Sequence, residues 1–77
     1  MTTLVDTHGP RRVRTPEEIG AAIRARRKAL GLTQEDVAAQ TGLSRPTVGA
    51  IEGGKDTAQI GIVLQVCADL GLEIRIG

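Results

Sequence analysis

The chain has 77 residues, of which 40% are hydrophobic and 25% charged, and it contains no Phe, Trp or Tyr. This length allows one domain, which buries only roughly 60% of the surface that its unfolded chain exposes. Without aromatic rings the chain cannot stack bases, which excludes the modules that read single strands or RNA in that way. One cysteine, Cys67, and one histidine, His8, exclude a disulfide framework and a zinc site made by this chain alone.

The charge is +1 overall, but it is unevenly distributed along the chain. Seven of the ten basic residues lie between positions 11 and 28, against two glutamates there, which is typical of a phosphate-binding flank or of a solvated helix face. The first ten residues hold no apolar run long enough for a signal peptide, and no stretch approaches the ~20 apolar residues of a membrane span. We therefore expect an intracellular protein without a membrane partner.

Residues 1–14 read as a basic, flexible leader that contains the turn signal Gly9-Pro10. The first helix signal follows at Thr15, an N-cap residue with proline at the first helical position and glutamate three residues later. Acidic residues in this first turn also favour the positive end of the helix dipole. We predict a helix that ends at Gly31 and whose buried face consists of Ile19, Ala22, Ile23 and Leu30.

Two short helices are predicted next. Thr33 begins one of them, with Val37 and Ala38 facing inward and Gly42 at its end. Ser44 begins the other, Pro46 falls in its first turn, where a missing N–H costs nothing, and Gly53-Gly54 ends it. The connections between these helices have three residues or fewer, so we expect the helices to pack at a steep angle.

The spacing of the apolar residues changes from a helical to a strand-like period at Gly71. A fourth helix is expected before it, capped by Thr57, with an apolar stripe of Ile60, Val63, Leu64, Cys67 and Leu70. Residues 72–76 then alternate apolar and charged side chains, which indicates a half-buried strand. A lone strand needs a neighbour for its hydrogen bonds. Either residues 13–15 of the same chain or a second copy of the protein could supply that neighbour.

The segments Arg27–Ala38, Gly42–Arg45 and Ile51–Lys55 together resemble the lambda-repressor-like (Xre) helix-turn-helix family. The resemblance covers about residues 16–71. It implies an all-α domain of four to five helices at residues 15–71 that binds double-stranded DNA and represses transcription, with no enzymatic activity and no cofactor. The usual fifth helix is replaced by the strand-like residues 72–77. In this the chain is similar to HipB-like antitoxins, which repress their own operon and bind a HipA-type kinase toxin in the bacterial cytoplasm.

The resemblance assigns roles to individual positions. Gln34 and Ser44 would hold backbone phosphates at the starts of the second and third helices, where free N–H groups carry a partial positive charge. Arg45 is the best candidate for reading a base, because its fork matches guanine O6 and N7. A structural ion pair is implied between Arg27 and Glu52. The further candidates for DNA contact are Pro46, Thr47, Ala50, Lys55, Arg11, Arg12 and Arg14.

Few side chains of this motif can read bases directly. Gly49 has no side chain to present to a base, and the charges between Thr33 and Gly54 are Glu35, Asp36, Glu52 and Arg45, a net of −2. Specificity is then expected to depend on DNA shape or on the basic leader.

The tail predicts the assembly. One helix-turn-helix covers few base pairs, so we expect a two-fold homodimer on a palindromic operator. Pairing of two tail strands would build it through Leu72, Glu73, Ile74, Arg75 and Ile76. Two alternatives stay open: a stand-alone Xre-type regulator without a toxin, and a protein-binding module of the same fold that no longer binds DNA. An enzyme is disfavoured, because the glycines are scattered at helix ends and form no phosphate-binding loop.

Overall fold

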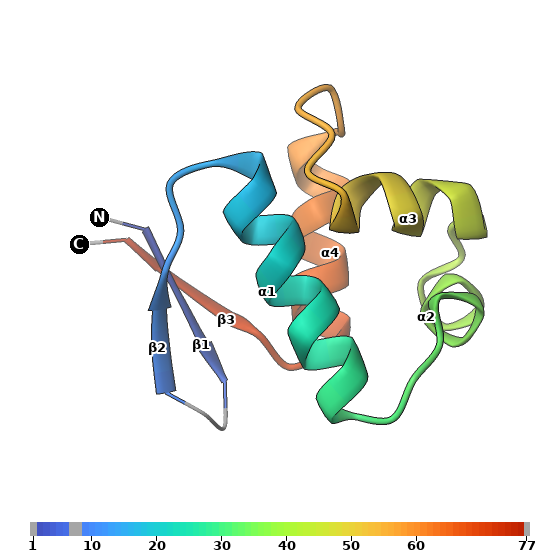
Figure 1. Cartoon of the computed structure of the whole chain (residues 1–77), viewed down its shortest axis with the longest axis horizontal. Helices are drawn as coiled ribbons and strands as arrows, with labels where there is room; N and C mark the ends of the chain where they lie inside the picture. The colour runs from blue at the N-terminus through green and yellow to red at the C-terminus, as the bar shows by residue number, and fades with distance from the viewer. Residues whose placement is uncertain (1, 7–8, 77) are drawn as a thin grey trace.

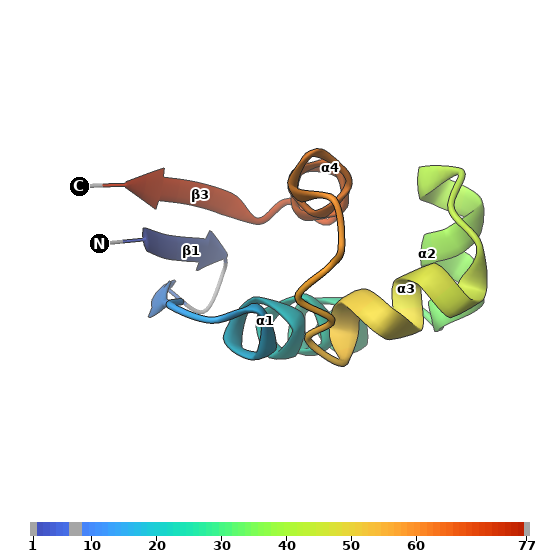
Figure 2. The same cartoon turned by 90° about the horizontal axis from the view of Figure 1, so that it is seen from above.

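A computed structural model describes residues 2–6 and 9–76, and Met1, Thr7, His8 and Gly77 lie outside the described part. Figure 1 shows a small sheet on one side of helix α1 and the helices α2 and α3 on the other side. Seen from above in Figure 2, β3 and α4 form an upper layer over β1 and α1. The elements are β1 (Thr2–Asp6), β2 (Gly9–Arg12), α1 (Pro16–Ala29), α2 (Gln34–Thr41), α3 (Arg45–Glu52), α4 (Ile60–Asp69) and β3 (Glu73–Ile76).

The three strands form one antiparallel sheet in the order β2-β1-β3. The expectation of an all-α domain is therefore imprecise, and residues 2–6 and 9–12 of the expected flexible leader form two of these strands. The strand predicted at residues 72–76 is present as β3 at Glu73–Ile76, but its neighbour within the chain is β1, where Leu4 lies opposite Ile74, and not residues 13–15. Pro10 is tolerated in β2 because β2 is an edge strand, where a missing N–H breaks no ladder on the outer side.

Side-chain caps fix the starts of the first three helices. Thr15, Thr33 and Ser44 each accept a hydrogen bond from the backbone N–H three residues later, at 3.0–3.2 Å. At Thr33 the capping box is complete, since the carboxylate of Asp36 accepts from the Thr33 N–H at 2.8 Å. The expected cap of the fourth helix at Thr57 is wrong, because the N-cap is Gln59 and its side chain makes no capping bond.

The core is aliphatic and joins both ends of the chain to the helices. Two residues outside the predicted helices, Leu4 of β1 and Val13, are each 2% exposed, so the hairpin is part of the core. Conversely, three residues expected on buried faces, Leu30, Ile60 and Leu64, are exposed. The buried hydrophobic residues are Leu4, Val13, Ala22, Ile23, Val37, Ala38, Val48, Ile51, Val63, Val66, Cys67, Leu70 and Leu72.

The position of α3 depends on a close approach of α1. A Cβ on Gly20 would overlap the carbonyl oxygen of Ile51, so only glycine lets α1 pack against the end of α3. At the other end of α1, the guanidinium Nε of Arg26 donates to the carbonyl oxygen of Leu70 at 2.8 Å. That carbonyl lies at the C-terminus of α4, so α1 is joined to both α3 and α4. None of the helices in the described ranges is long and apolar enough to cross a membrane.

Candidate nucleic-acid interface

Helices α2 and α3 form a helix-turn-helix around a tight turn at residues 42–44. Gly42 ends α2 with φ +75°, a left-handed conformation that favours glycine, and Ser44 begins α3 two residues later. The buried residues of the two helices face the core from one side, namely Val37 and Ala38 of α2 and Val48 and Ile51 of α3.

The described structure places five of the ten predicted DNA-contact residues at the starts of α2 and α3, namely Gln34, Ser44, Arg45, Pro46 and Thr47. Arg45 and Pro46 occupy the first turn of α3 and are exposed, while Thr47 and Ala50 are half-exposed. The Ser44 and Thr47 hydroxyls are hydrogen-bonded to each other at 2.8 Å, so both are fixed beside the N-terminus of α3. Lys55 is exposed in the loop after α3. This cluster can offer one guanidinium fork, hydroxyl groups and helix N-termini to an anionic ligand.

A buried ion pair ties α1 to the end of α3. The Nε and Nη2 of Arg27 donate to the two carboxylate oxygens of Glu52 at 2.7 and 3.0 Å, and the two side chains are 10% and 3% exposed. A third guanidinium nitrogen, Nη1, donates to the carbonyl oxygen of Leu32 at 2.8 Å. The hydrogen bond to Glu52 raises the pKa of Arg27 above its ordinary value, against the opposing effect of burial. This pair therefore fixes α3 against α1 and the loop before α2.

Gln34 belongs to the same network. Its amide Nε2 donates to Glu52 Oε1 at 3.2 Å, which orients the first residue of α2 towards α3. Glu52 thereby receives three hydrogen bonds, two from Arg27 and one from Gln34. The sequence predicted the pair of Arg27 with Glu52 but not this third bond, because nothing in the spacing of Gln34 and Glu52 indicates that their side chains meet.

The candidate base-reading residue has a weak partner in the folded chain. The Nε of Arg45 lies 3.9 Å from a carboxylate oxygen of Glu35, and the two side chains are 60% and 80% exposed. An exposed pair at this distance contributes about 0–1 kcal/mol, so it can be released at little cost. The guanidinium of Arg45 is therefore available to a ligand.

The basic residues of the N-terminal segment lie apart from this cluster. Arg11 and Arg12 belong to β2, and Arg14 lies in the connection from β2 to α1. Figure 1 places this sheet and the helices α2 and α3 on opposite sides of α1. All three arginines are exposed. If they contact DNA, they do so on a stretch other than the one next to Arg45.

The predicted dimerisation residues are partly used within the chain. Leu72 is buried, and Ile74 is half-buried opposite Leu4 of β1. Ile76 is 82% exposed. The side chains of Glu73 and Arg75 are exposed and paired with each other at 3.2 Å. One edge of β3 is thus occupied by β1, and its other edge is unpaired in the described sheet.

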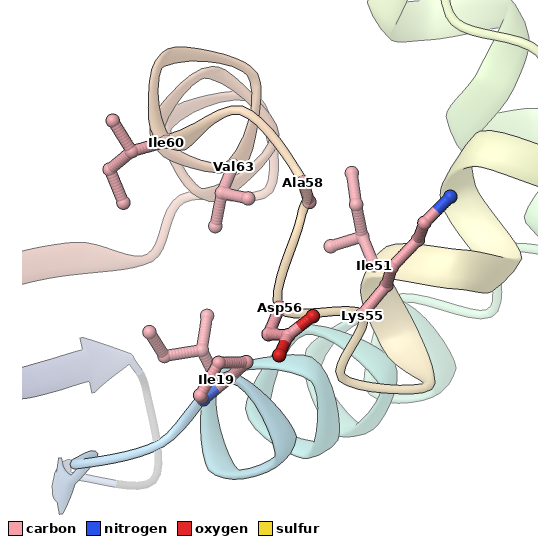
Figure 3. A pocket seen from close by; sticks show the side chains of 8 residues that line it. Ile19, Ile51, Lys55, Asp56, Ala58, Ile60 and Val63 are labelled. Carbon is pink, nitrogen blue, oxygen red and sulfur yellow. The ribbon is translucent and has the colours of Figure 1, made fainter.

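Figure 3 shows a separate hollow of about 210 Å³ between the starts of α1 and α4. Ile19 of α1 and Val63 of α4 point towards each other across it. Its lining is apolar apart from one ammonium and one carboxylate, and it has no hydroxyl, thiol or imidazole group. Nowhere in the described ranges do three or more His, Cys, Asp or Glu side chains gather as metal ligands would. The lining residues are Pro16, Ile19, Ile51, Lys55, Asp56, Ala58, Ile60 and Val63.

Comparison with known proteins supports the interpretation of α2 and α3 as a helix-turn-helix. The model of the helix-turn-helix family HTH_3 matches residues 23–76. An uncharacterized HTH-type transcriptional regulator, y4mF, of Sinorhizobium fredii is 44% identical over 66 residues, which cover 86% of this chain and 87% of the relative. Another uncharacterized HTH-type transcriptional regulator, from Methanothermobacter thermautotrophicus, is 39% identical over 66% of this chain and 74% of its own length.

Solved structures show the same fold. HipB in a complex with an O4 20mer superposes with a TM-score of 0.79 at 19% sequence identity and covers 87% of this chain and 94% of its own. The restriction-modification controller protein C.AhdI from Aeromonas hydrophila has a TM-score of 0.66 at 33% identity and covers 75% of this chain and 84% of its own. With its family model, its named relatives and its helix-turn-helix geometry in agreement, the chain belongs to the Xre-like HTH_3 family of helix-turn-helix transcriptional regulators.

Proposed function

We propose that the protein is a dimeric repressor that reads an operator with the first turn of α3. The observation that carries this proposal is the cluster of Ser44, Arg45 and Thr47 at the N-terminus of α3, beside Gln34 at the start of α2. In this family of folds the recognition helix enters the major groove with its N-terminal residues against the base edges. Arg45 would read a guanine, and Gln34, Ser44 and Thr47 would hold phosphates. Pro46 and Ala50 offer only apolar contact, such as to a thymine methyl group.

Substitution of Arg45 tests this reading. Arg45→Ala should weaken binding to the operator by about 1–3 kcal/mol and relax selectivity at one base pair in each half-site. The assay is anisotropy of a labelled duplex from the protein's own promoter, compared with duplexes changed at single base pairs. Arg45 is exposed, so the variant should keep the circular dichroism spectrum of the parent protein. Unchanged discrimination between bases would reduce Arg45 to a phosphate contact.

The arginines of the N-terminal segment are proposed to touch flanking phosphates, and Lys55 to touch a phosphate after α3. Replacing Arg11, Arg12 and Arg14 together with alanine should reduce affinity for every sequence. The slope of log affinity against log salt should become shallower by about 0.9 for each lost phosphate contact. An unchanged slope would leave these three residues as solubilising charges.

A homodimer is proposed through the unpaired edge of β3. Two β3 strands that run antiparallel about a two-fold axis at Ile74 would join the two sheets and place Glu73 of one copy beside Arg75 of the other, a cross-strand pair that contributes about 0.2–1 kcal/mol. Exposed apolar side chains support this surface, since Ile60 and Leu64 of α4 and Ile76 of β3 are exposed. Figure 2 shows that α4 and β3 lie in one layer of the molecule. In a small domain such residues are typical of an interface.

Sedimentation equilibrium tests the dimer. Deleting residues 72–77 should give a monomer that no longer binds a palindromic operator tightly, but this deletion also removes buried Leu72. Ile76→Lys is sharper, because Ile76 is 82% exposed and its replacement leaves the monomer core intact. The control is Gln65→Lys, which adds the same charge to an exposed position of α4. A dimer that survives both the deletion and Ile76→Lys would move the interface to another surface.

An antitoxin role is proposed as the biological setting. The fold is shared with HipB, and one of the HipB structures is a complex of HipA, HipB and O2-O3. A HipA-type kinase toxin encoded beside this chain and co-purifying with it would support that role. Without such a partner the protein is a stand-alone Xre-type regulator. Wild-type protein that binds no duplex DNA, even at low salt, would favour a protein-binding module of this fold.

A further inference from the structure

A polar hollow of about 270 Å³ lies where α1, α2 and α3 meet. Its walls are contributed by Arg24 and Arg27 of α1, Gln34 of α2, and Gly49, Glu52 and Gly53 at the C-terminal half of α3 and just beyond it. Gly49 and Gly53 are four residues apart and so lie one above the other on the helix surface. A Cβ at Gly49 would meet the Gln34 side chain at 3.6 Å, so the missing side chain leaves this space open.

Arg24 sets the net charge of the hollow, because the other two charged residues that line it neutralise each other. The carboxylate of Glu52 is neutralised by Arg27 and takes a further hydrogen bond from Gln34, and it is nearly inaccessible. Arg24 is exposed. It takes part in none of the three ion pairs found among the described residues, which join Arg27 to Glu52, Arg45 to Glu35 and Arg75 to Glu73. No carboxylate in that part of the chain therefore competes for the Arg24 guanidinium.

We propose that this hollow seats one phosphate of the DNA backbone and that Arg24 is its charged ligand. The inference rests on the proposed function, in which Arg45 enters the major groove. At a rise of 1.5 Å per residue, Gly49 and Gly53 lie about 6 and 12 Å along the helix axis from Arg45. The major groove is about 12 Å wide, so the face of α3 that carries Gly49 and Gly53 meets the phosphates that border the groove, whereas Ala50 lies on the next face of the helix and stays turned towards the bases.

The chemistry fits a phosphate. An arginine fork binds two phosphate oxygens at once, and the glycines let the DNA backbone approach the helix closely. The site also resolves the electrostatics of the motif. The sequence between Thr33 and Gly54 has a net charge of −2, but Arg27 of α1 neutralises Glu52 inside the fold and the exposed Arg24 adds one more positive charge beside that pair. The negative balance expected from the segment alone is thereby cancelled.

The experiment measures affinity for a promoter duplex as a function of salt for Arg24→Gln, Arg24→Lys and Lys28→Gln. Lys28 is the matched control, since it is exposed one turn further along α1 and does not line the hollow. Arg24→Gln should make the slope of log affinity against log salt shallower by about 0.9, which is roughly a fivefold loss of affinity at physiological salt. Arg24→Lys should keep the slope of the wild-type protein. The ratio of the affinity for the operator to the affinity for a scrambled duplex should stay unchanged in all three variants.

A second measurement locates the contact. Duplexes in which single phosphates are replaced by uncharged methylphosphonates should reveal one position per half-site that weakens the wild-type protein and leaves Arg24→Gln unaffected. The proposal is overturned if Arg24→Gln keeps the wild-type slope, or if Lys28→Gln lowers the slope equally, because the effect would then come from the general charge of α1. It is also overturned if no methylphosphonate position distinguishes Arg24→Gln from wild type. Failure of the wild-type protein to bind duplex DNA at all would instead refute the proposed function.

Discussion

Removal of the Glu52 carboxylate should destabilise this domain more than removal of any exposed carboxylate. In Glu52→Ala the Arg27 guanidinium stays in its buried position, where its side chain is 10% exposed, and keeps only the bond from Nη1 to the Leu32 carbonyl. Breaking one partner of a buried pair typically costs about 3–5 kcal/mol, because an uncompensated charge remains buried. The amide of Gln34 loses its acceptor as well.

This cost is large for a chain of 77 residues. At about 0.05–0.15 kcal/mol per residue, its total stability is about 4–12 kcal/mol. A loss of about 3 kcal/mol lowers the Tm of a domain this small by about 12–24 °C. Glu52→Ala should therefore unfold at a markedly lower temperature than the wild-type protein, and it should lose DNA binding as it unfolds.

The assay is urea denaturation followed by far-ultraviolet circular dichroism, since the chain has no Trp or Tyr to report by fluorescence. The matched control is Glu35→Ala, which removes an exposed glutamate whose partner, Arg45, lies 3.9 Å away at the surface. That control should cost less than about 1 kcal/mol. If Glu52→Ala costs as little as Glu35→Ala, the pair does not fix α3 against α1 and the reasoning from burial is refuted.

Three further predictions concern single positions. Hydrogen bonds from Thr33 lower the pKa of Asp36, so its carboxylate stabilises the fold above the unfolded pKa of about 3.9, and this stability is lost as pH falls through the lower folded value. The Tm of Asp36→Asn should lie below wild type at neutral pH and converge with it in acid; a constant difference would contradict the capping role. Burial raises the pKa of the Cys67 thiol to about 11, so a thiol reagent at neutral pH should label it only as fast as the protein opens, and rapid labelling of folded protein would contradict its burial. Gly20→Ala should destabilise by about 1–3 kcal/mol despite the better helix propensity of alanine, because its Cβ would clash with the Ile51 carbonyl. Gly61→Ala, with nothing within 4 Å, is the control and should stabilise by up to about 1 kcal/mol.

Local signals in the sequence were sufficient for the helix-turn-helix. Thr15, Thr33 and Ser44 cap helices where an N-cap was predicted, because capping needs only residues within one turn of the chain. The same reasoning failed at Thr57, where the cap is Gln59 without a side-chain bond, since the glycine and polar residues of that loop allow several starts. The exposure of Leu30 has a similar cause: it follows the last residue of α1, where the periodicity of the helix no longer decides which side chain is buried.

The sheet is where sequence reasoning was weakest, because strand pairing is not local. Residues 2–5 include threonine and valine, which favour strands, and Gly9-Pro10 follows as a turn signal, so the hairpin could have been predicted from composition. The basic residues and the proline in β2 suggested a leader instead. Proline is compatible with an edge strand, and only the order β2-β1-β3 shows that β2 is one. The alternation of apolar and charged residues at positions 72–76 predicted β3, but it could not indicate which strand pairs with β3 through backbone hydrogen bonds.

The hairpin changes how the tail can act. β1 lies between the other two strands and occupies one edge of β3, so a second copy could reach only the other edge. A chain without β1 could exchange its tail freely, whereas here β3 is held in register by Leu4 opposite Ile74 before any dimer forms. The backbone groups of the unpaired edge and the exposed Ile76 are then preorganised, which reduces the ordering cost of association. We expect a hairpin variant such as Leu4→Ala to weaken dimerisation through this loss of order, although Leu4 itself is 2% exposed and cannot touch a second copy.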